Sequence, residues 1–193
     1  MDKEQLNEAR TNPEFLKYLE ETRVDAIATK NISALYEVLD SFLILDLDEE
    51  KINAVYQNIL KIAFEEVQNK IDNDKKLTLD GDDLFYVRAF YEHAIEKWSY
   101  DNFDGARQLL FVLLNITEDE TLQKALKAHI ISLAINTTLD NFYENDVNLE
   151  ASNEDEKYGY FITEFDYNLD EYLQLNEDTY NQEYEKLKHL LEK

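Results

Sequence analysis

Glycine and proline are scarce in this chain, and that scarcity limits the folds open to it. Its 193 residues include three Gly and one Pro. Sharp turns and irregular loops depend on these residue types, because Gly tolerates left-handed backbone and Pro fixes a bend. So few of them favour long helices joined by short polar turns. The length suits one compact domain or a short array of repeats.

Apolar residues recur at helical spacing through much of the sequence. Between residues 32 and 45 they fall at i, i+3, i+4, i+7 and i+8, the pattern of a helix with one face in a core. Asn12 before Pro13 predicts a helix start, because Asn caps helices and Pro is tolerated at the first helical position. The pattern predicts two sets of three helices, at about 13–30, 32–45 and 48–67, and at about 82–100, 102–116 and 118–139.

The two sets of helices align with each other at a shift of 71 residues. Asn31 then falls on Asn102, and Asp48 falls on Asp119. Apolar positions keep their register over three segments without an insertion. The matching turn residues argue against chance, because turns have no 3.6-residue period. We therefore predict an all-α fold in which a duplicated three-helix unit forms a short α-solenoid or helical bundle, with copies at about 13–67 and 84–138.

The C-terminal third has a different composition from the repeat. Between Asp140 and Glu185 there are 15 acidic residues and one Lys, so this segment carries −14 of the net charge of −24. It also contains seven of the 13 Tyr residues. We predict a repeat domain over 1–139, with a polar linker at 69–81 between its copies, and an acidic, Tyr-rich segment over 140–193 that packs on it. Within that segment we expect a polar loop at 145–157, a short extended stretch at 158–165, and helices near 169–175 and 179–191.

The charge balance excludes one class of partner. The chain has 43 acidic and 19 basic residues. Proteins that bind nucleic acid cluster Lys and Arg to displace counterions from phosphate, so we expect no direct binding to nucleic acid. An acidic field instead favours basic protein partners, because it speeds their encounter.

Several features predict a cytoplasmic protein. There is no apolar run of 18 or more residues, so we expect no membrane span. The N-terminal residues lack the basic start and apolar stretch of a signal peptide. The chain has no Cys, which excludes disulfides and thiolate metal sites.

No pattern for catalysis or metal binding is present in the sequence. The three histidines, His93, His129 and His189, belong to no H-E-x-x-H or E-x-x-H motif. His129 lies near an apolar stripe and aligns with Asn58 of the first copy at the 71-residue shift. A polar residue at this repeat position predicts a hydrogen bond within the packing. The acidic clusters at 72–74 and 80–83 do not fit the register of a calcium loop. We therefore predict a protein that is not an enzyme and has no cofactor and no metal site.

One segment resembles a helix pair of the tetratricopeptide repeat family. In Phe90–Ala106, the residues Ala94, Phe103 and Ala106 match that family's small–aromatic–small spacing, and Trp98 falls near its aromatic position. The segment is similar to repeats of small acidic bacterial chaperones that hold secretion substrates. The resemblance covers this one helix pair. It implies a concave groove that binds a peptide or helix of a partner.

The leading hypothesis is a non-enzymatic protein-interaction module, either a chaperone or an adaptor. The residues predicted to bind the partner are aromatic: Tyr91, Trp98, Tyr100, Tyr158, Tyr160 and Phe161. A structural alternative is that the aromatic residues of the C-terminal third cap the end of the helical array.

Two other functions remain open from the sequence. One is an immunity- or antitoxin-type inhibitor whose acidic residues in 140–185 cover a basic surface of a nuclease or nucleic-acid-binding protein. The other, ranked third, is a metal-dependent helical hydrolase that uses clustered Asp and Glu.

Overall fold

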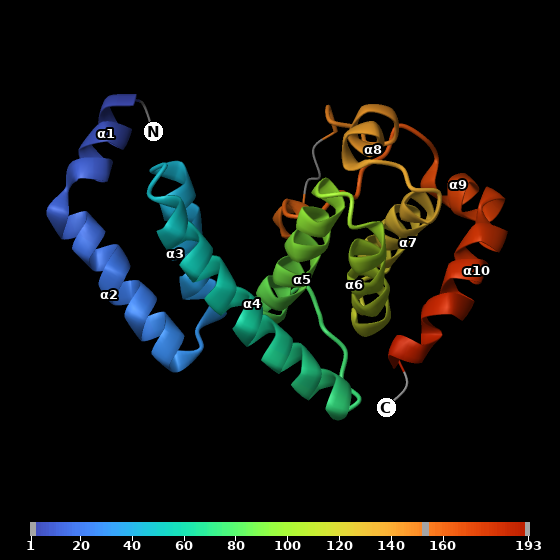
Figure 1. Ribbon diagram of the computed structural model, residues 1–193, viewed down its shortest axis with the longest axis horizontal. Coiled ribbons are helices and arrows are strands. Elements are labelled where there is room, and N and C mark those ends of the chain that lie inside the picture. The colour runs from blue at the N-terminus through green and yellow to red at the C-terminus, as the bar shows by residue number, and fades with distance from the viewer. Residues whose placement is uncertain (1–2, 152–154, 192–193) are drawn as a thin grey trace. The chain divides into compact units, whose positions relative to one another are not determined.

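The computed structural model describes residues 3–151 and 155–191 (Figure 1). Over these residues it contains ten α-helices, two short 3₁₀-helices and no β-strand, which confirms the predicted all-α class. No helix of the described chain is both long enough and apolar enough to cross a bilayer. The chain divides into two compact units, Met1–Gln68 and Asn69–Lys193.

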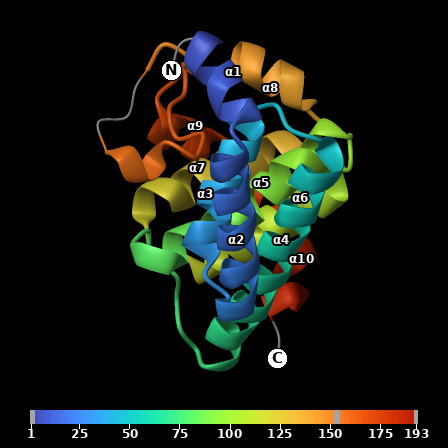
Figure 2. The same ribbon diagram turned by 90° about the vertical axis from the view of Figure 1, so that its left-hand side faces the viewer.

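The first unit contains α1 (Lys3–Thr11), α2 (Pro13–Thr29), α3 (Ile32–Ile44) and most of α4 (Glu49–Asp72) (Figures 1 and 2). As predicted, α2 starts at Pro13. The Asn12 side chain accepts hydrogen bonds from two N–H groups of its first turn. Helix α1 was not predicted, because its few apolar residues form no clear stripe. Helices α2 and α3 pack against each other as a hairpin.

The second unit is built from three long helices, α5 (Gly81–Ser99), α6 (Phe103–Ile116) and α7 (Glu120–Ala134). Helix α6 packs against both α5 and α7. The buried residues of α6 are Ala106, Leu110, Phe111, Leu113, Leu114 and Ile116, as expected of a helix covered by neighbours on more than one side. The chain then continues through α8 (Leu139–Asn145), η1 (Glu156–Tyr158), α9 (Leu169–Leu175), α10 (Glu177–Leu187) and η2 (Lys188–Leu191).

The turns α2–α3 and α5–α6 have the same backbone geometry, 71 residues apart. Lys30 and Asp101 both take left-handed backbone, with φ of 54° and 57°. The next residues, Asn31 and Asn102, each donate their N–H to the carbonyl five residues earlier, at 2.9 Å in both turns. Each Asn side chain also caps the following helix by accepting from the N–H three residues later. These local contacts explain why the sequence register repeats at the turns.

Within the second unit, the C-terminal third packs on the long helices α6 and α7. Helices α9 and α10 contact α7, and α10 and η2 contact α6 (Figure 1). Helices α9 and α10 lie where the sequence predicts helices. Helix α8 was not predicted, and residues 152–154 of the predicted loop at 145–157 lie outside the described residues. The division between the two compact units falls after Gln68, within the range predicted as one repeat domain.

The segment between α4 and α5 differs from the predicted polar linker. Helix α4 continues to Asp72, and Leu77 and Leu79 are buried. Leu77 donates its N–H to the Ile116 carbonyl at 2.7 Å and accepts the Glu118 N–H at 2.9 Å, so it pairs with the α6–α7 turn. The linker is therefore fixed to the second unit by its apolar residues and its backbone.

A buried carboxylate joins the end of the chain to α6. The side chain of Glu183 in α10 is 3% exposed and lies 3.1 Å from the guanidinium of Arg107 in α6. Lys186, on the next turn of α10, pairs with the other carboxylate oxygen at 2.5 Å. A buried charge without its partner is costly, so this contact favours α10 in its observed position.

Replacing this carboxylate is expected to destabilise the fold. Glu183→Gln removes the buried charge that faces Arg107 and leaves the guanidinium only its pair with the exposed Asp104, so it should lower the free energy of unfolding by about 2 kcal/mol. Glu185→Gln removes the same charge from an exposed pair with Lys188 and should change it by less than about 0.5 kcal/mol. Urea denaturation of both variants measures the difference. Equal effects would show that the Glu183 pair contributes nothing specific.

Candidate functional site

The six aromatic residues predicted to bind a partner have different environments in the second unit. Tyr91, Trp98 and Phe161 are buried. Tyr158 is half-buried. Only Tyr100, 80% exposed, and Tyr160, 39% exposed, present large surfaces to solvent.

Trp98 serves the packing of the core. Its ring lies 4.8 Å from that of Phe142 in α8, measured between centroids. Its indole N–H donates to the Thr137 carbonyl at 2.8 Å. Trp98 is fully buried, so it holds α5 against the α7–α8 segment and offers no surface to a partner.

A cavity of about 340 Å³ brings together three of the predicted residues, Tyr91, Tyr160 and Phe161. We call it the aromatic cavity. Its walls come from α5, α8 and the segment after η1, and its complete lining is Tyr91, Glu92, Ile95, Tyr143, Gly159, Tyr160, Phe161 and Ile162. Trp98, Tyr100 and Tyr158 do not line it.

The rings of the aromatic cavity are held by edge-to-face contacts. Phe161 meets Tyr91 at a centroid distance of 5.3 Å and an interplanar angle of 81°. It meets Tyr160 at 6.4 Å and 82°. Such geometry places the positive edge of one ring against the negative face of another. Tyr143 is half-buried, and burial raises the pKa of its hydroxyl.

A chain of buried hydrogen bonds fixes the inner wall of the cavity. The Tyr91 oxygen accepts the N–H of Ile162 at 3.0 Å and lies 3.0 Å from Nε2 of His129. Nδ1 of His129 lies 2.6 Å from the Ala125 carbonyl, which accepts only, so Nδ1 carries the proton and Nε2 accepts the Tyr91 O–H. The hydrogen bond predicted for His129 is therefore present.

Burial keeps both members of this pair neutral. The His129 side chain is fully buried, and the loss of hydration lowers its pKa to about 4. Burial also raises the pKa of the Tyr91 hydroxyl well above its ordinary value. Neither group has the protonation behaviour of an acid–base catalyst near neutral pH, and the pair joins α5, α7 and the segment after η1.

A carboxylate lines the outer wall of the cavity, and a cation outside the lining contacts the same wall. The guanidinium of Arg88 lies 4.2 Å from the centroid of the Tyr160 ring, within the range of a cation–π contact. Its Nε pairs with Glu92 at 2.7 Å. The Arg88 side chain is 8% exposed, whereas that of Glu92 is 32% exposed. The carboxylate is thus the more accessible of the two charges.

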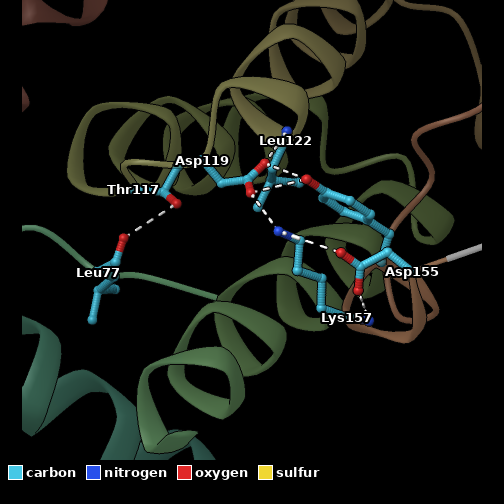
Figure 3. A network of polar contacts seen from close by, with 7 residues as sticks. Leu77, Thr117, Asp119, Leu122, Asp155 and Lys157 are labelled. Atoms are coloured by element: carbon cyan, nitrogen blue, oxygen red, sulfur yellow. Dashed lines mark hydrogen bonds and ion pairs between the residues drawn. The ribbon is translucent and has the colours of Figure 1, made fainter. Parts of the chain in front are cut away.

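Asp119 holds the chain segment that leads into the cavity (Figure 3). One of its carboxylate oxygens accepts the Leu122 N–H at 2.9 Å and so caps α7. The other accepts the Tyr158 hydroxyl at 2.9 Å and lies 3.4 Å from the Lys157 ammonium. Tyr158 lies three residues before Phe161, so this anchor sets where the aromatic wall begins.

The far side of the same segment is fixed by backbone pairing and by stacked rings. Val147 and Phe165 form an antiparallel bridge, the only part of the predicted extended stretch with ladder pairing among the described residues. The ring of Tyr167 stacks between Phe165, at 5.4 Å, and Tyr172, at 4.4 Å. These rings support the structural alternative that the C-terminal aromatic residues cover the end of the helical array.

Comparisons with family models, with curated proteins and with solved structures gave no match. Within the described residues no group of three or more His, Cys, Asp or Glu side chains is placed to hold a metal ion. The site is therefore described by its own chemistry: aromatic rings, one accessible carboxylate and a unit with 28 acidic and 12 basic residues.

Neutral, buried His129 should make stability depend on pH. In the unfolded chain its pKa is about 6.5, whereas in the folded protein it is about 4, so only the unfolded chain takes up the proton between these values. Stability should fall as the pH is lowered from 6.5 towards 4, by at most about 3 kcal/mol. Urea denaturation between pH 7.5 and 4.5, compared with His129→Gln, isolates this effect from the carboxylates common to both proteins. If the free energies of unfolding of the wild type and of His129→Gln changed in parallel with pH, this role of His129 would be contradicted.

Removing the Asp119 carboxylate should loosen the segment before the cavity. Asp119→Ala removes the α7 cap, which costs about 1 kcal/mol, and also the contacts of Tyr158 and Lys157. Hydrogen exchange of amides in 156–165 should become at least tenfold faster, as measured by mass spectrometry. Asp48→Ala is the matched control, because Asp48 accepts the Glu50 N–H at the equivalent turn of the first unit. The result would contradict this role for Asp119 if both variants left 156–165 equally protected.

Proposed function

We propose that this chain is a non-enzymatic protein-interaction module, a cytoplasmic chaperone or adaptor that holds a basic segment of a partner protein. The observation that carries the proposal is the aromatic cavity, where Tyr91, Tyr160 and Phe161 meet around one small space. All three were predicted from the sequence to contact a partner. Aromatic side chains are common anchors of protein interfaces, because they bury large areas at low entropic cost.

The chemistry of the lining favours a cationic side chain as occupant. Rings and one accessible carboxylate, Glu92, line the cavity, and no basic side chain is among its described lining residues. The Tyr160 ring already carries the Arg88 guanidinium, which is the type of contact that a Lys or Arg of the partner would make. A volume of about 340 Å³ is within the range of sites that bury a side chain or small ligand.

Long-range charge supports the same class of partner. The second unit has an excess of 16 acidic residues, so its field attracts basic proteins and repels the phosphates of nucleic acids. Electrostatic attraction of this kind raises the rate of encounter more than the final affinity. The cavity would then supply the short-range contacts that retain the partner.

The inhibitor hypothesis draws its support from the exposed carboxylates of 140–185. Most of the described acidic residues in this range are solvent-exposed, including Asp140, Glu144, Glu150, Asp166, Glu171 and Asp178. A surface of this kind is suited to covering a basic nuclease or nucleic-acid-binding protein. The two functions differ in which residues dominate the affinity, the rings of the cavity or the exposed acids.

Tyr160→Ala should weaken binding of the partner at least tenfold, because it opens the outer wall of the cavity. Tyr100→Ala is the matched control: it removes an exposed Tyr of the same unit that does not line the cavity. Partners are first captured from the source cell and identified by mass spectrometry. Affinities of the purified partner for the wild type and both variants are then measured at low and high salt.

The outcomes of this experiment separate the hypotheses. Equal affinities of Tyr160→Ala and Tyr100→Ala, or no specific partner of the wild type, would overturn the proposed use of the cavity. A third variant with Asp140, Glu144 and Asp166 changed to amides tests the alternative. If it loses far more affinity than Tyr160→Ala, and the partner is a nuclease that the wild type inhibits, the inhibitor function replaces the chaperone or adaptor function.

A further inference from the structure

The first unit has a groove of its own where α1 and α2 meet the end of α3. Its volume is about 560 Å³. It lies entirely within residues of the first unit, and its lining is Gln5, Glu8, Ala9, Asn12, Phe15, Ser41, Ile44 and Leu45. We call it the α1–α3 groove. The groove shares no lining residue with the aromatic cavity.

Apolar side chains form the floor and one wall of the α1–α3 groove. Leu45 is 2% exposed and forms part of the packed floor. Ile44, the last residue of α3, is 62% exposed although it is fully apolar. Its neighbour Leu43 is 53% exposed. Ile44 lines the groove and Leu43 lies next to it outside the lining, and exposed aliphatic surface at a preformed groove is typical of a protein-binding surface.

Polar contacts fix the shape of the groove. At the bend between α1 and α2, the Asn12 side chain caps α2 and its N–H donates to the Ala9 carbonyl. In the last turn of α1, the Arg10 guanidinium donates to the Leu45 carbonyl at 2.5 Å and lies 3.4 Å from Asp46. Arg10 thus satisfies a carbonyl at the end of α3 and ties α1 to it. The groove therefore exists before any partner binds.

Charge identifies the kind of occupant. The first unit has 15 acidic and seven basic residues, and the exposed carboxylate of Glu8 lies in the groove lining. Arg10, a basic residue beside the groove, is already engaged by Leu45 and Asp46. A second copy of this chain would bring another net charge of −24 against it, which opposes self-association. An apolar helix face flanked by basic residues has the complementary pattern.

We infer that the α1–α3 groove binds an amphipathic helix of a partner whose apolar face is flanked by Lys or Arg. The apolar row of that helix lies along Phe15, Ile44 and Leu45, and a basic residue beside it faces Glu8. This is recognition of a helix in a groove, in which apolar anchors give affinity and flanking charge gives orientation. The inference extends the proposed protein-binding function to the first unit.

Three labelled peptides of about 20 residues, long enough to form a helix, test the inference on the full chain. The first has a Leu face flanked by Lys. The second has the same Leu positions with Glu in place of Lys. The third has the composition of the first in an order without an apolar face. Fluorescence anisotropy should show binding of the first peptide at least tenfold tighter than of the other two.

Two chain variants locate the binding. Ile44→Glu puts a charge into the groove wall, whereas Val24→Glu adds the same charge at a 54% exposed site of α2 outside the lining. Both should retain the wild-type helix content and unfolding midpoint. Ile44→Glu should weaken the first peptide at least tenfold relative to Val24→Glu, even though added negative charge alone favours a basic peptide.

Four results would overturn the inference. They are absence of binding by the first peptide, equal binding of the acidic or the scrambled peptide, equal effects of the two variants, and a dimer of the wild type that Ile44→Glu abolishes in sedimentation equilibrium. The last would assign the groove to a second copy. None of these changes the aromatic cavity, so the groove can fail its test while the function proposed for the second unit stands.

Discussion

The hydrogen-bonded pair of Tyr91 and His129 is the interaction on which the second unit depends. It lies where α5, α7 and the segment after η1 meet, and each of its polar atoms has a partner in one of them. In an apolar core such a chain is satisfied in only one arrangement, because an unpaired buried donor or acceptor is costly. The pair therefore selects a single position for Ile162, and with it the adjacent wall of the aromatic cavity. The contact that completes the core also forms the site.

Local sequence patterns predicted the helices well because helices are local. The caps at Asn12, Asn31 and Asn102 act through side chains on N–H groups two or three residues later, so a short stretch of sequence contains the whole interaction. The apolar spacing of α3 and α6 likewise needs no knowledge of the partner surface. The prediction failed where the local signal is weak, as in the short helices α1 and α8. It also failed in the linker, whose two buried Leu residues stand among polar neighbours.

The site was only partly predictable from the sequence, because its contacts join residues far apart in the chain. Composition pointed to Tyr91, Tyr160 and Phe161, but nothing local separates them from Trp98, which the fold buries completely. Asp119 was recognised as a turn residue and not as the anchor of Tyr158, a contact across 39 residues. No sequence pattern marked Arg88 or Tyr143 as part of a site. A periodicity identifies which face of a helix is buried, but not which distant segment covers it.

The pairing of Leu77 with the α6–α7 turn means that the second unit needs residues that precede its first long helix, α5. A polypeptide that starts at Gly81, the first residue of α5, would lack the backbone that accepts the Glu118 N–H and donates to the Ile116 carbonyl. It would also lack the Lys70 ammonium that pairs with Asp83 at 2.8 Å. The shortest autonomous form of this unit therefore has to include the last turn of α4. The eleven residues from Lys70 to Asp80 resemble a linker in sequence, but part of their backbone and side chains belongs to the packed core of this unit.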